Sequence, residues 1–152
     1  MKKTNDYDGN IIDLHCHILH QVDDGAKTLQ ETIEMLSIAA EEGIRTIAAT
    51  SHFLDDVVSV NSYLKLWHKR MKEVQSALDK LKMDINIVRG AEVLISPFLS
   101  ELKGIEKLCI NGSRYLLMEL PMFDIPQYTE DVIYSLRLKG IIPIIAHPER
   151  TR

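Results

Sequence analysis

The sequence has little cysteine and no large excess of charge of either sign. Its 152 residues include two cysteines, Cys16 and Cys109, and the formal net charge at pH 7 is −4. Two cysteines without framework spacing do not predict a disulfide-stabilised secreted domain, and a cytosolic setting would keep both reduced. The basic residues are dispersed over predicted helices, which disfavours a dedicated nucleic-acid surface.

Long hydrophobic runs and a charged-then-apolar leader are also absent from the sequence. Hydrophobic residues make up 45% of the chain and charged residues 26%, as in ordinary globular domains. Neither membrane insertion nor a signal peptide is predicted, and we expect a cytoplasmic protein. A chain of this length fits one domain. Residues 1–10 are expected to form an N-terminal tail, and 11–152 the single domain.

Helical patterns recur along the chain. Thr28 and Glu31 form a capping box for a helix that Gly43 would end. Apolar residues at steps of three and four predict an amphipathic helix over 62–82. Thr129 is expected to cap a third helix. The sequence therefore predicts helices that are separated by shorter apolar segments.

These apolar segments are typical of strands. The first begins at Ile11, and the others lie at 44–50, 85–88, 115–118 and 141–146. Strands that alternate with helices and are apolar on both faces predict a parallel sheet with right-handed crossovers. The expected fold class is α/β.

Histidines and carboxylates stand where the apolar runs end. In Asp13-Leu14-His15-Cys16-His17, the alternation of a strand would turn His15 and His17 to one face, where both could bind one ion. Later runs lead to His52, Glu92, Glu119 and His147. In a parallel barrel the carboxyl ends of the strands meet at one mouth, so we expect a metal site there. The alternative is a set of buried, hydrogen-bonded histidines, which would need several coincident placements.

Other polar residues near these motifs have less specific interpretations. Asp13 could orient an imidazole or bond to a neighbouring loop, and Asp23 is expected to shape the loop before Gly25. His20 and His68 are expected to be solvated. These residues are therefore left out of the predicted metal site.

The two cysteines and two aromatic residues can also be given roles from their positions in the sequence. Cys109 and Arg114 are separated by four residues, one fewer than cysteine-dependent phosphatases use, so Cys109 is predicted to be a buried apolar residue. Cys16 should face away from the metal site. Phe123 and Tyr128 could line a pocket for an aromatic substrate, although core packing is the more common role.

With these motifs the chain resembles the PHP superfamily, named for its polymerase and histidinol-phosphatase members. Within it, the chain is similar to bacterial manganese-dependent protein-tyrosine phosphatases of capsule and exopolysaccharide synthesis. The matching stretches are Asp13–Leu19, Val22–Gly25, Thr50–His52, Gly90–Glu92, Ser113–Tyr115 with Glu119, and Ala146–Arg150. The resemblance implies a distorted TIM-like barrel of parallel strands with as many as three Mn²⁺ ions at its mouth.

The resemblance also implies which residues would bind each metal ion and which would bind the phosphate. His15, His17 and Glu92 would hold the first ion, Glu119 and His147 would support the second, Asp24 and His52 would contribute to the third, and Arg150 would bind the phosphate. The family pattern continues to a later Asp-x-His with two further ligands, whereas this sequence ends at Arg152. We therefore expect a partial barrel without its closing C-terminal units.

The implied function is that of a metal-dependent protein-tyrosine phosphatase. Its protein substrate would be a bacterial tyrosine kinase of capsular or exopolysaccharide synthesis. Unclosed strands leave free edges, so self-association through the open barrel edge is also expected. Two alternatives remain: a small-molecule phosphatase of the histidinol-phosphatase type, and a non-catalytic truncated fragment that binds metal or a partner.

Overall fold

Short strands and helices alternate along the protein. The computed structural model describes residues 11–122 and 124–150, so the predicted tail over 1–10 and the prediction for Phe123 lie outside the described residues. The strands are β1 (Ile11–Cys16), β2 (Ile44–Ala49), β3 (His52–Phe53), β4 (Asn86–Arg89), β5 (Glu92–Leu94), β6 (Tyr115–Glu119) and β7 (Ile142–Ala146). The main helices are α1 (Leu29–Glu41), α2 (Val60–Leu81) and α3 (Thr129–Leu138). Short 3₁₀ helices are η1 (Leu99–Glu101), η2 (Ile105–Leu108), η3 (Ile110–Gly112) and η4 (Pro148–Arg150).

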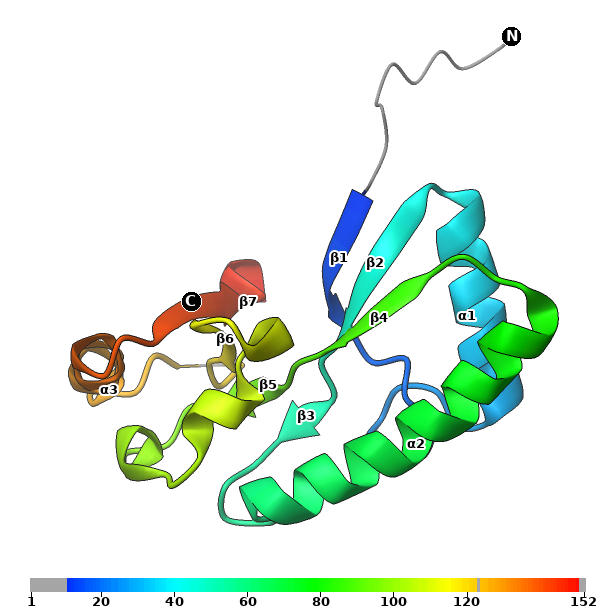
Figure 1. Cartoon of the computed structure of the whole chain (residues 1–152). Coiled ribbons are helices and arrows are strands. Elements are labelled where there is room, and N and C mark those ends of the chain that lie inside the picture. Colours follow the sequence, from blue (N-terminus) through cyan, green and yellow to red (C-terminus); the bar gives the residue numbers. More distant parts are fainter. Residues whose placement is uncertain (1–10, 123, 151–152) are drawn as a thin grey trace, which may run out of the picture.

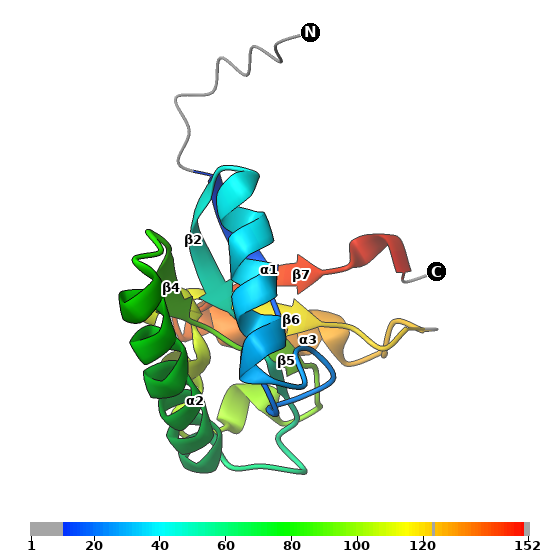
Figure 2. The ribbon, with the colours of Figure 1, turned by 90° about the vertical axis from the view of Figure 1, so that its right-hand side faces the viewer.

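The strands form two sheets rather than the single sheet that the sequence predicted. One has the order β1-β2-β4 and the other the order β3-β5-β6-β7 (Figure 1). The pairings between neighbouring strands are parallel in both sheets. The helices α1 and α2 contact each other beside the first sheet (Figure 2), and α3 contacts β7 in the second. The α/β class with parallel strands is confirmed.

Two neighbouring strands are interrupted at the same level, which divides the sheets. Ala49 pairs with Arg89 at the end of β2 and β4, and His52 pairs with Glu92 at the start of β3 and β5. The two residues between each pair of strands lie outside either ladder. His52 and Glu92 follow the ends of β2 and β4, as predicted, and each also begins a short second strand that the sequence did not indicate.

The helix ends largely follow the local sequence. Thr28 Oγ1 accepts the Glu31 backbone N–H at 3.1 Å, so the predicted cap of α1 is confirmed. The predicted cap of α3 is wrong, because Thr129 is the first helical residue and Tyr128 occupies the cap position. The Thr129 N–H donates to the Pro126 carbonyl at 2.9 Å, which turns the chain into the helix one residue earlier.

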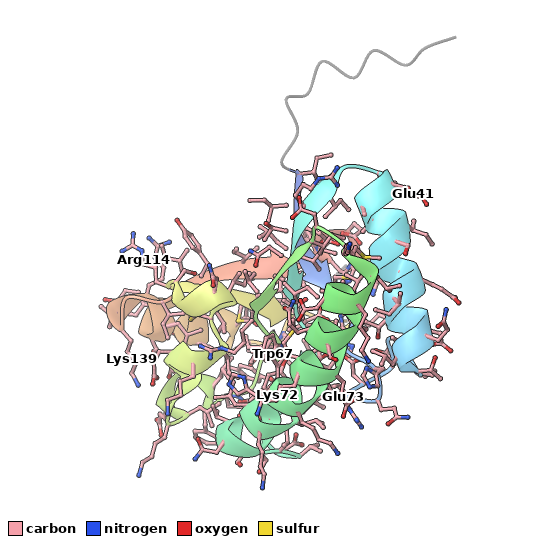
Figure 3. The ribbon with its side chains drawn as sticks, turned by 45° about the vertical axis from the view of Figure 1, so that its right-hand side comes forward. Glu41, Trp67, Lys72, Glu73, Arg114 and Lys139 are labelled. Atoms are coloured by element: carbon pink, nitrogen blue, oxygen red, sulfur yellow. The ribbon has the colours of Figure 1, made fainter. Side chains whose placement is uncertain are left out.

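The core contains a tryptophan from α2 and a cysteine that the sequence predicted to be buried. Trp67 on α2 is 5% exposed, and its indole N–H donates to the Ala49 carbonyl at 3.1 Å (Figure 3). Cys109 is fully buried, as predicted. Among the described residues, no helix combines the length and apolar character that a membrane span needs.

The outer strands β1 and β7 leave one side of the molecule apolar. Each is the last strand of its sheet. Large apolar side chains of β1 are exposed, with Ile12 at 57%. A pocket of about 230 Å³ lies beside them, lined by Leu14, Ile110, Ser113, Tyr115 and Ile144. Unpaired strand edges next to apolar surface favour association.

Candidate metal centre

Glu92 lies at the centre of a group of imidazoles. Its Oε2 is 3.0 Å from His15 Nε2, 2.9 Å from His17 Nε2 and 3.3 Å from His52 Nδ1. The residue is 1% exposed, and its Oε1 is buried with no hydrogen-bond partner among the described residues. A buried carboxylate with a free oxygen beside three imidazoles is a donor set that fits a divalent transition-metal ion.

Two more carboxylates border this group. Glu119 Oε2 lies 3.4 Å from His52 Nδ1. Asp24 Oδ1 lies 3.6 Å from His52 Nε2 and 3.7 Å from His17 Nδ1. Three sets of residues place one ligand atom from each member within 4.8 Å of the others: His15, His17 and Glu92; His17, Asp24 and His52; His52, Glu92 and Glu119. His52 therefore links the outer carboxylates to Glu92.

His147 and Arg150 enter the site from the chain that follows β7. The His147 ring lies 4.7 Å from the His15 ring, measured between centroids, and its Nδ1 lies 3.3 Å from Glu149 Oε1. The backbone of His147 has a φ of +46°, in the left-handed region. This turn lets the Arg150 N–H donate to the His147 carbonyl at 3.0 Å and brings both side chains to the same pocket.

The pocket has a volume of about 380 Å³. It is lined by His17, Asp24, Gly25, His52, Glu92, Glu119, Met122, His147 and Arg150. Seven of the eight predicted site residues are in this lining, and the eighth, His15, contacts Glu92. Arg150 supplies the cationic side chain of a lining that is otherwise rich in imidazole and carboxylate. The structure therefore brings the predicted residues together.

Asp23 is a candidate functional residue that the sequence did not indicate. Its Oδ2 lies 2.7 Å from His17 Nδ1 and accepts the His52 backbone N–H at 2.8 Å, while Oδ1 accepts the Gly25 N–H at 3.0 Å. The last contact confirms its predicted role in the loop. A carboxylate on Nδ1 fixes the ring and leaves Nε2 directed at Glu92. The Asp23-Asp24 pair hinted at this role, but its partners depend on the loop's path.

Hydrogen bonds set the charges of this group. Burial alone would raise the pKa of Asp23, but hydrogen bonds from His17, Gly25 and His52 lower it to about 2. Burial opposes the charged form of His17, yet its hydrogen bonds to Asp23 and Glu92 raise the pKa to about 10. The pKa of Glu92 is lowered to about 2 against its burial, chiefly by bonds from His15 and His17. A proton and a metal ion would therefore compete for His17.

Gly25 allows the loop after His17 to close tightly. A Cβ at this position would lie 2.1 Å from the His17 carbonyl oxygen. Next to it, the Ala26 N–H donates to the same oxygen at 3.2 Å. The loop that carries Asp23 and Asp24 is therefore fixed by a close approach that a side chain would prevent.

Three other sequence predictions have mixed outcomes. Asp13 contacts neither of the predicted partners, because it accepts the backbone N–H of His15 in its own strand at 3.0 Å. The prediction that His20 is solvated is wrong. The residue is 4% exposed and its Nε2 lies 2.7 Å from Glu73 Oε2 on α2. The loop that carries His20 packs against α2, and the contact joins residues that are 53 positions apart in the sequence. His68 is exposed, as predicted.

The remaining predictions concern Cys16 and Tyr128. Cys16 is half-buried and packs against the core, and burial is the main cause that raises the pKa of its thiol to about 12. Tyr128 also packs against the core, and it lines a second pocket of about 390 Å³ with Phe98 and Leu94. Packing against the core, the more common role, is therefore confirmed for Tyr128, and its role in a substrate pocket stays a prediction.

A parallel α/β fold that gathers imidazoles, carboxylates and an arginine in one pocket is typical of metal-dependent hydrolases of phosphate esters. The family model for capsular polysaccharide synthesis, CpsB/CapC, matches residues 11–152. The chain belongs to this family, which confirms the resemblance stated from its motifs.

Curated relatives and a solved structure extend the comparison. The chain is 40% identical over 147 residues to the tyrosine-protein phosphatase YwqE of Bacillus subtilis, covering 93% of this chain and 56% of the relative. It is 41% identical over 143 residues to the putative tyrosine-protein phosphatase CapC of Staphylococcus aureus, covering 93% and 55%.

The solved structure comes from a study of YwqE from Bacillus subtilis and CpsB from Streptococcus pneumoniae, described as unique metal-dependent tyrosine phosphatases. It superposes with a TM-score of 0.84 at 36% identity, covering 93% of this chain and 57% of that one. The chain thus spans little more than half the length of these relatives.

Proposed function

We propose that this chain acts as a metal-dependent phosphatase on phosphotyrosine in proteins. The observation that carries the proposal is the buried Glu92 carboxylate, which faces three imidazoles in a pocket shared with Arg150. The relatives named tyrosine-protein phosphatase support the substrate class. The chain covers 56% of YwqE, so the activity of these relatives is proposed for this chain.

The proposed ligand sets are those that the family resemblance implies, and the first of them is also a group whose ligand atoms lie within 4.8 Å of one another. His15, His17 and Glu92 would hold one ion, Glu119 and His147 a second, and Asp24 and His52 a third. When bound, such ions would supply Lewis-acid chemistry that activates water and neutralises charge on the phosphoryl group. Imidazole and carboxylate ligands suit manganese, iron and zinc, and we propose Mn²⁺ as the ion.

The chain's own residues prepare the pocket for a phosphate ester. Asp23 holds the Nδ1 proton of His17, which keeps Nε2 directed at Glu92. Arg150 is more than half exposed at the pocket rim. Its planar guanidinium can donate two parallel N–H bonds to phosphoryl oxygens, which a lysine cannot reproduce. The guanidinium would therefore orient the substrate.

The proposed partner is a bacterial tyrosine kinase of capsular or exopolysaccharide synthesis, met in the cytoplasm. The family's role in capsular polysaccharide synthesis supports the biosynthetic part of this proposal. We also propose that residues 11–152 form one domain, a partial barrel of the PHP type. Its free edges β1 and β7 and the apolar surface between them would favour self-association.

Hydrolysis of a phosphotyrosine peptide by the metal-free chain, with and without added Mn²⁺, tests this function. We expect turnover only with Mn²⁺, and its loss in His15→Ala and Glu119→Ala. Turnover that is unchanged in either variant would contradict the proposed site. A folded wild-type chain that binds Mn²⁺ but hydrolyses no phosphotyrosine would favour a metal-binding fragment. Hydrolysis of histidinol phosphate alone would favour the small-molecule alternative.

A further inference from the structure

Tyr63 lies where the interrupted strands come together. It projects from α2, is 3% exposed, and its hydroxyl oxygen is 3.1 Å from the Ser51 carbonyl oxygen and 2.9 Å from the Gly90 carbonyl oxygen. Ser51 directly precedes His52, and Gly90 is two residues before Glu92. The hydroxyl therefore joins the two backbone segments that lead into the proposed metal centre.

The two interruptions are packed closely against each other. A Cβ at Gly90 would lie 2.7 Å from Thr50 Cγ2. The Glu92 N–H crosses to the Ser51 carbonyl at 3.1 Å. In an uninterrupted parallel ladder, backbone amides would supply evenly spaced donors at this level. Here a side-chain hydroxyl supplies a donor, and buried carbonyl groups require one.

The Tyr63 ring is fixed by its neighbours. It packs edge-on against Phe53, with 5.5 Å between ring centroids and 87° between ring planes. Phe53 is fully buried and directly follows His52. Burial raises the pKa of the Tyr63 phenol well above its usual range, so the hydroxyl keeps the proton that it donates. Tyr63 thus contacts the residues on both sides of His52, namely Ser51 and Phe53.

We propose that Tyr63 is a positioning residue of the metal centre. Its hydroxyl ties the backbone before His52 to the backbone before Glu92, and this tie sets the separation of the two side chains. The proposal rests on the proposed function, because it assumes that these side chains bind metal. Residues that orient metal ligands typically change affinity by 10- to 100-fold when they are replaced.

Titration of the metal-free chain with Mn²⁺ alone tests this role. Tyr63→Phe removes one oxygen and keeps the ring, and we expect Mn²⁺ binding to weaken by about tenfold or more. Amide hydrogen exchange in the metal-free protein gives a second measurement, since the Glu92 N–H should exchange faster in this variant. Tyr134→Phe is the matched control, because Tyr134 lies on α3 and is 65% exposed. It should change neither measurement.

Val74→Ala separates positioning from general loss of stability. Val74 is fully buried on the same helix, far along α2 from Tyr63. The Val74→Ala variant should have a lower melting temperature but should bind Mn²⁺ as tightly as the wild type. Unchanged binding in Tyr63→Phe, or equal weakening in Val74→Ala at a matched melting temperature, would overturn the role of Tyr63. A wild-type chain that binds no Mn²⁺ would overturn the metal centre itself, and the positioning role with it.

Discussion

The carboxylate of Asp23 holds the imidazole of His17 at a distance of 2.7 Å between Oδ2 and Nδ1. The same oxygen accepts the backbone N–H of His52. One half-buried aspartate thus orients a proposed ligand that follows β1 and anchors the start of β3. Asp23 therefore holds both the His17 ring and the backbone of His52 in place.

Asp23→Asn should weaken binding of Mn²⁺ by about 10- to 100-fold, the usual effect of losing a carboxylate behind a ligating histidine. Isothermal titration of the metal-free chain measures the change. Asp55→Asn is the control, because Asp55 accepts a hydrogen bond from Ser96 outside the metal pocket. An affinity in Asp23→Asn within twofold of the wild-type value would contradict the assigned role.

Gly25→Ala should lower the free energy of unfolding by about 1–3 kcal/mol, the cost expected when a close contact is overpacked. The added Cβ would lie 2.1 Å from the His17 carbonyl oxygen. Urea denaturation measures the change. In Gly112→Ala the new Cβ would meet no atom within 4 Å, although φ is +66°. The Gly25 variant should therefore be the less stable of the two, and the reverse order would argue against the tight loop.

Glu73→Ala should lower the urea midpoint of unfolding. The variant leaves His20, which is 4% exposed, without its contact at Nε2, and His20 Nδ1 already lacks a partner among the described residues. Buried polar atoms without partners are destabilising. Asp79→Ala removes an exposed contact to Gln75 on the same helix and should change the midpoint much less. Equal midpoints would show that the His20 contact contributes nothing.

Arg150→Lys should raise KM for a phosphotyrosine peptide and reduce kcat/KM by about tenfold or more, since lysine keeps the charge but not the paired N–H donors. Arg114→Ala is the control. Arg114 precedes the start of β6, whereas Glu119 ends that strand in the pocket. Full activity in Arg150→Lys would contradict the role of the paired N–H donors and would show that only the positive charge of Arg150 is needed.

Cys109 gives a prediction that depends on pH. Burial is the main cause that raises the pKa of its thiol from 9.0 to about 11. The folded protein therefore keeps this proton where the unfolded chain loses it, and stability should fall as pH rises from about 9 to about 11. Urea denaturation across this range, compared with Cys109→Ala, measures the effect. An identical pH dependence in both proteins would contradict it.

Residue spacing predicted which side chains gather, because apolar runs mark strands and the residues after them meet at one end of a parallel sheet. His17, Glu119 and His147 follow this rule. Spacing could not reveal that two strands are interrupted before His52 and Glu92. The backbone carbonyls there accept hydrogen bonds from Tyr63 and Trp67, whose placement depends on how α2 packs. The contact of the buried His20 with Glu73 was missed because it joins residues 53 positions apart in the sequence.

Because Glu92 lies at the start of β5, the pocket is built from both sheets. His15 comes from the sheet of β1, β2 and β4, whereas Glu92 and Glu119 come from the sheet of β3, β5, β6 and β7. The proposed ligands therefore span the seam between the sheets, and the pocket exists only while the sheets are docked. Any change that shifts one sheet against the other would separate His15 from Glu92 and Glu119.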